Sequence, residues 1–275
     1  MQLNPNDYDI NTMMNGTDNK CYIVISNQDD KKEWKKIDDL TEFLDSLSDE
    51  FYNIAYMPIV EKMNEPETGL EEKFGGTKPF FVKGEQWPSL NNFHMTFFGQ
   101  LKDPRKKNNM LYRIFIMIDD TDNDFEEDYW INTIELNEAN LKNQIILEKP
   151  LYLNLINSTS IPYSNIYEPY KITDYTEKFE LQSFHEFLED FDIPKYNYAI
   201  DNTLYNKFYD AYISANKFPS CGVKIGGTPM STQSPESVEE YDFLQISETE
   251  YLPYGWGDSG IAHVSHTCEF IWDCC

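Results

Sequence analysis

The placement of glycine is the feature of this sequence that most limits its fold. The chain has twelve glycines, and ten of them fall in two clusters with none between Gly99 and Gly222. The first cluster is Gly75, Gly76, Gly84 and Gly99, and the second is Gly222, Gly226, Gly227, Gly255, Gly257 and Gly260. Because glycine tolerates positive φ, each cluster predicts tight turns that connect strands.

The two clusters open alike. Lys73-Phe74-Gly75-Gly76-Thr77-Lys78-Pro79 compares with Lys224-Ile225-Gly226-Gly227-Thr228-Pro229, and the downstream Phe98-Gly99-Gln100-Leu101 compares with Phe243-Leu244-Gln245-Ile246. This pattern favours one supersecondary unit used twice, with repeat turns at Gly75, Gly76, Gly226 and Gly227 and a buried glutamine in the strand that follows. On the residues alone, two unrelated glycine turns stay open as the alternative.

The same segments carry a resemblance to a known family. FGGTKPFFVKGEQWP, FFGQL and LYRIFIMID, followed by KIGGTPMSTQ, FLQIS, GWGDSGIAHV and FIWDCC, resemble the signatures of the YwqG-like family, whose function is unknown. The resemblance runs from Lys73 to Cys275. It implies an α+β fold in which antiparallel sheets form two similar halves with helices packed on them, and it implies no established activity or cofactor. Ser259 and His263 depart from the small or aromatic residues expected there.

The length of 275 residues allows one large domain or two small ones. We expect residues 1–70 to form an N-terminal arm, strand and helix packed on the main domain. Residues 71–275 should form the YwqG-like domain, whose halves, 71–156 and 218–275, are joined by a helical middle segment.

Hydrophobic periodicity predicts the individual elements. Apolar residues at helical spacing predict a helix within Ile37–Met63, broken at Met57-Pro58, and two more over Thr176–Phe191 and Thr203–Lys217. Aromatic and β-branched runs predict strands at Cys21–Ile25, Phe80–Val82, Phe93–Leu101, Leu111–Ile118, Trp130–Leu136, Gln144–Leu147 and Leu151–Leu155.

The charge excludes several kinds of partner. Asp and Glu number 48 against 22 Lys and Arg, which gives a net charge of -26. Such a chain repels nucleic acid and anionic membrane surfaces. No apolar run is long enough to span a membrane and the N-terminus does not resemble a signal peptide, so we expect a soluble cytoplasmic protein whose cysteines are free thiols.

Residues near the end of the chain are the best candidates for a binding cleft. Trp256, Asp258, Ser259 and His263 lie within or just after a Gly-rich segment that spells G-x-G-x-x-G. A dinucleotide site would need a preceding strand and a following helix, and both are missing from the pattern. A serine nucleophile would need a histidine base held by a carboxylate. No histidine stands in the sequence context of the trypsin-like proteases, and His263 and His94 stay open as bases that the fold could bring near. We therefore assign no catalytic residue.

Two further patterns raise the question of a metal-binding site. The soft ligands His263, His266, Cys268, Cys274 and Cys275 are dense, but on a single strand they would point to opposite faces. The acidic loop Asp119–Asp124 lacks the Gly and Glu of an EF-hand. We expect no metal and no cofactor.

The functional predictions follow from charge and from exposed aromatic residues. Tyrosines are frequent at protein interfaces, and six of them surround the middle segment: Tyr163, Tyr167, Tyr170, Tyr175, Tyr196 and Tyr198. We expect a non-enzymatic protein-interaction module that recruits a basic or apolar partner protein. The alternative is a small-ligand-binding protein or an enzyme that uses a cleft between the two repeats, and a third possibility is nucleic-acid mimicry.

Overall fold

The computed structural model describes residues 4–16, 18, 20–90, 93–116, 129–147, 168–193, 203–214, 222–231, 238, 241–247, 249, 251 and 260–274. The chain divides into two compact units. We call Met1–Ile54 with Phe179–Ser220 the small unit, and Ala55–Lys178 with Cys221–Cys275 the large unit. Among the described residues, no helix is long and apolar enough to cross a membrane.

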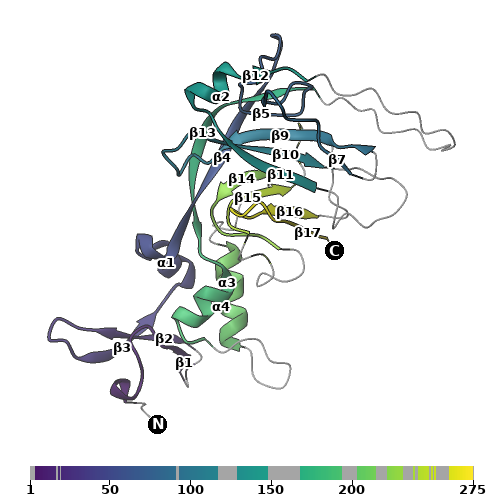
Figure 1. Ribbon diagram of the computed structural model, residues 1–275. Coiled ribbons are helices and arrows are strands. Elements are labelled where there is room, and N and C mark those ends of the chain that lie inside the picture. The colour runs from purple at the N-terminus through teal and green to yellow at the C-terminus, as the bar shows by residue number, and fades with distance from the viewer. Residues whose placement is uncertain are drawn as a thin grey trace. The chain divides into compact units, whose positions relative to one another are not determined.

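The large unit is built on one sheet of ten strands (Figure 1). Every strand pair in it whose register is defined is antiparallel. The strands lie in the order β11 (Tyr129–Glu135), β10 (Met110–Ile116), β9 (Thr96–Lys102), β5 (Lys73–Phe74), β13 (Tyr170–Leu181), β4 (Tyr52–Lys62), β14 (Val223–Gly226), β15 (Leu244–Ser247), β16 (Ile261–Val264) and β17 (Phe270–Asp273). The predicted α+β class with antiparallel sheet is therefore confirmed.

Short elements complete the large unit. They are the pair β6 (Phe81–Val82) and β12 (Gln144–Ile145), the pair β7 (Ser89–Leu90) and β8 (Phe93–His94), and helix α2 (Glu138–Lys142).

One hydrophobic core joins both ends of this sheet. The core contains Phe74, Phe98 and Ile114 from the first glycine cluster and its strands, together with Ile225 and Phe243 from the second. Aromatic rings make the contact close: the ring centroids of Tyr112 and Phe243 are 4.1 Å apart, and those of Tyr129 and Phe270 are 5.1 Å apart. Because these residues come from strands at opposite ends of the order, the sheet curls until it is nearly closed.

The small unit combines the start of the chain with its middle. Strands β1 (Met13–Asn15), β2 (Cys21–Ser26) and β3 (Lys32–Ile37) form an antiparallel sheet. It shares a core with the helices α1 (Leu40–Asp45), α3 (Phe184–Asp190) and α4 (Thr203–Ser214), and the 3₁₀ turns η1 (Pro5–Asp7) and η2 (Asp49–Phe51) complete it. Buried Leu44, Phe187 and Phe208 lie in that core, and the backbone N–H of Met13 donates to the carbonyl of Phe191 at 3.0 Å.

The helix predicted within Ile37–Met63 is correct only at its start. Asp39 caps α1 by accepting from the backbone N–H groups of Thr41 and Glu42, but the helix ends at Asp45. Residues Tyr52–Lys62 form strand β4 between β13 and β14. This stretch is rich in aromatic and β-branched residues, and sheet pairing with segments far along the chain overrides its helical spacing.

The helix predicted over Thr176–Phe191 is wrong in its first part. Strand β13 continues to Leu181, and α3 begins only at Phe184. The true start carries a capping box, in which Ser183 accepts from the N–H of Glu186 and the Glu186 side chain accepts from the N–H of Ser183. That Ser-x-x-Glu signal was present in the sequence and marks the boundary.

Most other predicted elements are confirmed. The helix expected over Thr203–Lys217 is α4, and the strands expected at Cys21–Ile25, Leu111–Ile118 and Trp130–Leu136 are β2, β10 and β11. The strand expected at Leu151–Leu155 lies outside the described residues.

Gly99 offers a test of the packing between β9 and β5. A Cβ atom there would lie 2.9 Å from the Lys73 carbonyl oxygen and 2.9 Å from Phe74 Cδ1. We expect Gly99→Ala to lower the free energy of unfolding by about 1–3 kcal/mol, because the neighbouring backbone must move. Urea denaturation measures it. The control is Thr96→Ala on the same strand, which should cost less than about 1 kcal/mol; equal losses would contradict the predicted clash.

Candidate functional site

Buried polar side chains form a row across one half of the large sheet. Lys73 pairs with Gln100, Gln100 with Arg113, and Arg113 with Asn132, on β5, β9, β10 and β11. Directly paired residues of antiparallel strands project from the same face. Lys73, Gln100 and Arg113 are fully buried. We call these four residues the first polar row.

The other half of the sheet carries a matching row. Lys224 pairs with Gln245, and Gln245 with His263, on β14, β15 and β16. All three side chains are buried. We call them the second polar row; its third member is a histidine where the first row has an arginine.

The strand that carries the lysine of each polar row continues into a Gly-Gly turn, and the two turns have similar backbone angles and hydrogen bonds. Gly75 and Gly76 have φ of 67° and 86°, and Gly226 and Gly227 have φ of 67° and 75°. The N–H of Gly75 donates to the carbonyl of Phe98 at 2.8 Å, and the N–H of Gly226 donates to that of Phe243 at 2.9 Å. Only glycine adopts this run of positive φ without strain.

The glutamines and lysines then hold the returning chain in corresponding ways. Gln100 Oε1 accepts from the N–H of Phe80 at 2.8 Å, and Gln245 Oε1 accepts from the N–H of Met230 at 2.9 Å. Lys73 Nζ donates to the carbonyl of Lys78 at 2.9 Å. Lys224 Nζ donates to the carbonyl of Thr228 at 2.6 Å.

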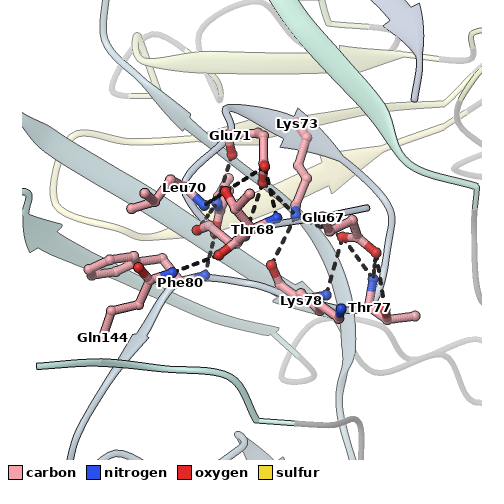
Figure 2. A network of polar contacts seen from close by, with 11 residues as sticks. Glu67, Thr68, Leu70, Glu71, Lys73, Thr77, Lys78, Phe80 and Gln144 are labelled. Atoms are coloured by element: carbon pink, nitrogen blue, oxygen red, sulfur yellow. Dashed lines mark hydrogen bonds and ion pairs between the residues drawn. The ribbon is translucent and has the colours of Figure 1, made fainter. Parts of the chain in front are cut away.

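Lys73 belongs to a network of polar contacts that also includes Glu67, Glu71 and Lys78 (Figure 2). Its Nζ lies 2.7 Å from a Glu67 oxygen and 3.4 Å from a Glu71 oxygen. With the Lys78 carbonyl, these contacts engage all three protons of the ammonium group. Lys73 is therefore held as a cation and has no lone pair for base or nucleophile chemistry.

The two glutamates of this network are held in their ionised form. Burial raises the pKa of Glu67, but the hydrogen bonds from Lys73 and from the N–H groups of Thr77 and Lys78 outweigh burial and lower it. Burial likewise raises the pKa of Glu71, but the hydrogen bonds from Thr68 and the charge of Lys73 lower it to about 2. The network is thus a triad of the buried Lys73 and two partly buried, ionised glutamates.

Arg113 holds residues 80–85, which we call the covering segment, against the first polar row. Its guanidinium donates to both Glu85 oxygens, at 2.8 and 2.9 Å, and to the Phe80 carbonyl at 2.8 Å. It also donates to Asn132 Oδ1 at 2.7 Å and lies 5.5 Å from the ring centroids of Phe81 and Trp130. These contacts make Arg113 a clamp between β10 and residues 80–85.

His263 is the one predicted cleft residue that the structure describes. It is fully buried in the second row, and burial lowers its pKa to about 4 despite the nearby Asp273 carboxylate. Neither ring nitrogen makes a hydrogen bond of normal geometry to a described residue, although the Met230 backbone is close enough to affect its pKa. Trp256, Asp258 and Ser259 lie outside the described residues, as do Gly255 and Gly257.

The proposed soft ligands do not share one strand. Strand β16 ends at Val264, and Cys268 has a φ of 67° in the turn that follows. The His266 ring contacts the Phe243 ring at a tilt of 31°, and its two nitrogens lie 2.9 Å from Arg105 Nη2 and 2.9 Å from Lys106 Nζ. Cys275 and the acidic loop Asp119–Asp124 lie outside the described residues, and within those described no His, Cys, Asp or Glu group is arranged to hold a metal.

An aromatic cluster on α3 and α4 was missed by the sequence reasoning. The Phe184 ring contacts the rings of Tyr205, Tyr209 and Tyr212 at 5.4, 5.4 and 5.2 Å, and the Tyr205 and Tyr209 rings lie within 9° of parallel. Tyr209 is 42% exposed. Tyrosines at i, i+4 and i+7 were a readable signal of one helix face. We call Phe184, Tyr205, Tyr209 and Tyr212 the aromatic face.

The tyrosines singled out in the sequence are placed differently. Tyr175 is half-buried and its hydroxyl donates to Glu72 at 3.0 Å, and Tyr170 contacts the ring of Tyr251. The other four, Tyr163, Tyr167, Tyr196 and Tyr198, lie outside the described residues.

Carboxylates lie close to the aromatic face. Burial raises the pKa of Tyr212 beyond the usual range, and the negative charges of Glu180 and Glu186 add to the rise. Glu186, Glu189 and Asp190 are exposed on α3. Tyr209 is the exposed ring of this cluster, and the exposed Glu186 lies close to the cluster. An exposed ring beside a carboxylate attracts cationic side chains.

The comparisons with known proteins add no relative. The sequence matches no protein-family model and no curated protein. The resemblance to the YwqG-like family therefore stays a prediction.

Lys73→Met tests the triad of Lys73, Glu67 and Glu71. Removing the cation leaves Glu67 and Glu71 facing each other without a counter-charge, so we expect the free energy of unfolding to fall by about 3–5 kcal/mol. The matched control is Lys171→Met on the adjacent strand β13, where the lysine is exposed and the loss should stay within about 0.5 kcal/mol. Chemical denaturation measures both; similar small losses would show that the triad contributes little.

Because His263 is buried, we expect the stability of the protein to depend on pH. The unfolded chain protonates this ring near its ordinary pKa of 6.5, whereas the folded protein resists protonation down to about 4. The unfolded state therefore binds more protons in this window, and stability should fall by up to about 3 kcal/mol as the pH falls through it. Comparing wild type with His263→Gln by urea denaturation between about pH 7 and pH 4.5 isolates the effect. Parallel curves would contradict a buried neutral histidine.

Proposed function

We propose that this chain is a non-enzymatic protein-interaction module whose aromatic face binds a basic segment of a partner protein. The observation that carries the proposal is the exposure of Tyr209, at 42%, within a cluster of four aromatic rings flanked by carboxylates. Exposed aromatic clusters of this kind are enriched at protein interfaces.

Two properties favour a basic partner over a purely apolar one. Arginine and lysine bind over tyrosine rings, and Glu186 beside the rings supplies the opposite charge. The net charge of -26 adds a long-range attraction that speeds encounter with a cationic segment.

The buried cations support a non-enzymatic interpretation of the first polar row. All three protons of Lys73 are engaged, and Arg113 is fixed by Glu85, Asn132 and a backbone carbonyl. These groups hold the covering segment on the sheet, so their charges serve the fold.

We also propose that the two halves of the large unit arose by duplication of one Gly-Gly-Thr unit, as the YwqG-like resemblance implies. The support is the set of corresponding contacts made by the paired glycines, glutamines and lysines. The strand order is consistent with this, because four strands of each half flank the central pair β13 and β4. The halves have diverged at Arg113 and His263.

Affinity capture with defined variants tests the interaction. Immobilised wild type should capture a basic protein that Tyr205→Ala/Tyr209→Ala loses by at least about tenfold, because the variant removes two of the four rings. Capture should weaken as salt is raised, since charge attraction is screened. The captured protein is then purified and titrated against each variant by calorimetry.

The control is Tyr8→Ala, which removes a half-buried tyrosine of the small unit that contacts Trp34 instead. It should capture like wild type. Partners retained equally by both variants, or turnover of a small molecule by the purified protein, would reject the proposal.

A further inference from the structure

The small unit contains a pocket of about 530 Å³ that is open to solvent, a size that accommodates a small organic ligand. We call this open pocket the cavity. Its walls come from β2, β3, α1 and α4 and the residues beside them. It is lined by Lys20, Cys21, Lys36, Ile37, Asp38, Asp39, Leu40, Thr41, Lys207, Asp210 and Ala211.

Three lysines from separate segments converge on this cavity. Lys20 precedes β2, Lys36 lies in β3, and Lys207 lies in α4. In a chain with 22 basic and 48 acidic residues, three lysines line this one pocket together with three aspartates. Lys207 is half-buried, with its Nζ 3.4 Å from Asn15 Oδ1, so its charge is positioned rather than free in solvent.

Two of the three lining aspartates already have other roles. Asp39 accepts from the backbone N–H groups of Thr41 and Glu42 at 2.8 and 3.2 Å, as the cap of α1. Asp38 forms an ion pair with Lys36. Asp210 is the third and is exposed.

The remaining lining is apolar or weakly polar. Ile37, Leu40 and Ala211 provide aliphatic surface, and the Cys21 thiol lies among them. Burial raises the pKa of Cys21, so this group is a neutral thiol at physiological pH. The cavity thus joins a charged rim of three lysines and three aspartates, which includes the ion pair of Lys36 and Asp38, to an apolar wall.

We propose that this cavity binds a small organic phosphate. Lysine ammonium groups bind phosphate as point charges, so Lys20, Lys36 and Lys207 contact the phosphoryl oxygens. The aliphatic wall then packs on the organic body of the ligand. This activity is separate from partner binding, because Lys207 and Ala211 lie on one side of the buried stripe of α4 around Phe208, and Tyr205 and Tyr209 lie on the other.

The net charge of the protein sharpens this assignment. A chain of charge -26 repels anions in general, so lysines scattered on its surface do not accumulate phosphate. Saturable binding of a phosphate therefore reports a local arrangement of cations.

Calorimetric titration of the full-length protein with phenyl phosphate and with inorganic phosphate tests the proposal. We expect saturable one-to-one binding of both, with phenyl phosphate tighter because the apolar wall contributes. Lys36→Met/Lys207→Met should weaken binding by at least about tenfold. Lys207→Arg keeps the charge and should bind within a few-fold of wild type.

Lys35→Met is the matched control, because this lysine neighbours Lys36 on β3 but is exposed and does not line the cavity. Its affinity should equal that of wild type, and circular dichroism checks that each variant is folded. The proposal would be overturned if neither phosphate saturates the wild type. It would also be overturned if Lys35→Met weakens binding as much as the double variant does.

Alkylation locates the ligand independently of affinity. Cys21 lines the cavity, whereas Cys268 lies in the large unit. Saturating phenyl phosphate should slow modification of Cys21 by iodoacetamide, measured by peptide mass spectrometry, and leave Cys268 unchanged. Binding that protects neither cysteine would place the phosphate elsewhere and reject this cavity.

Discussion

The large unit depends on how a buried lysine is kept charged. Lys73 lies on the sheet with no access to water, and its charge is tolerated only because Glu67, Glu71 and a backbone carbonyl surround it. A buried charge without such partners would cost several kcal/mol. The glycine turn at Gly75 and Gly76 brings the Lys78 carbonyl back over the lysine, so backbone conformation and electrostatics support each other. A side chain at Gly76 would displace the Glu67 carboxylate, since a Cβ there would lie 2.3 Å from a Glu67 oxygen.

The second polar row also holds the chain that returns after its glycine turn, but its third residue is a histidine and not an arginine. Its turn, its glutamine and its lysine make the contacts seen in the first row, but His263 stands where Arg113 binds Glu85. A guanidinium can pair with a carboxylate as long as that carboxylate is ionised, whereas a buried imidazole is stable only without its proton. The two halves of one sheet therefore respond differently to acid.

Sequence reasoning identified the local chemistry better than the long-range pairing. The Gly-Gly-Thr turns and the buried glutamines were visible because glycine and proline constrain the backbone through nearest neighbours. The helix expected across Tyr52–Lys62 was wrong because the partners of that strand, β13 and β14, lie more than a hundred residues away, and periodicity carries no information about them. The lysine cavity was unreadable for a similar reason. Lys36 and Lys207 both line the cavity only after α4 packs on α1, whereas in the sequence Lys36 stands in a run where lysines are mixed with acidic residues.

The strand order also has a consequence for how the protein is made. The centre of the large sheet is β5, β13, β4 and β14. Strand β4 comes first of the ten strands in the sequence, and its neighbours β13 and β14 leave the ribosome much later. Such non-local pairing slows folding and leaves early strands exposed while synthesis continues. Strand β4 can hydrogen-bond on both sides only after residue 226 has been added. Until then its edges can pair with other chains. The negative charge of the nascent polypeptide makes copies repel one another, which opposes such pairing.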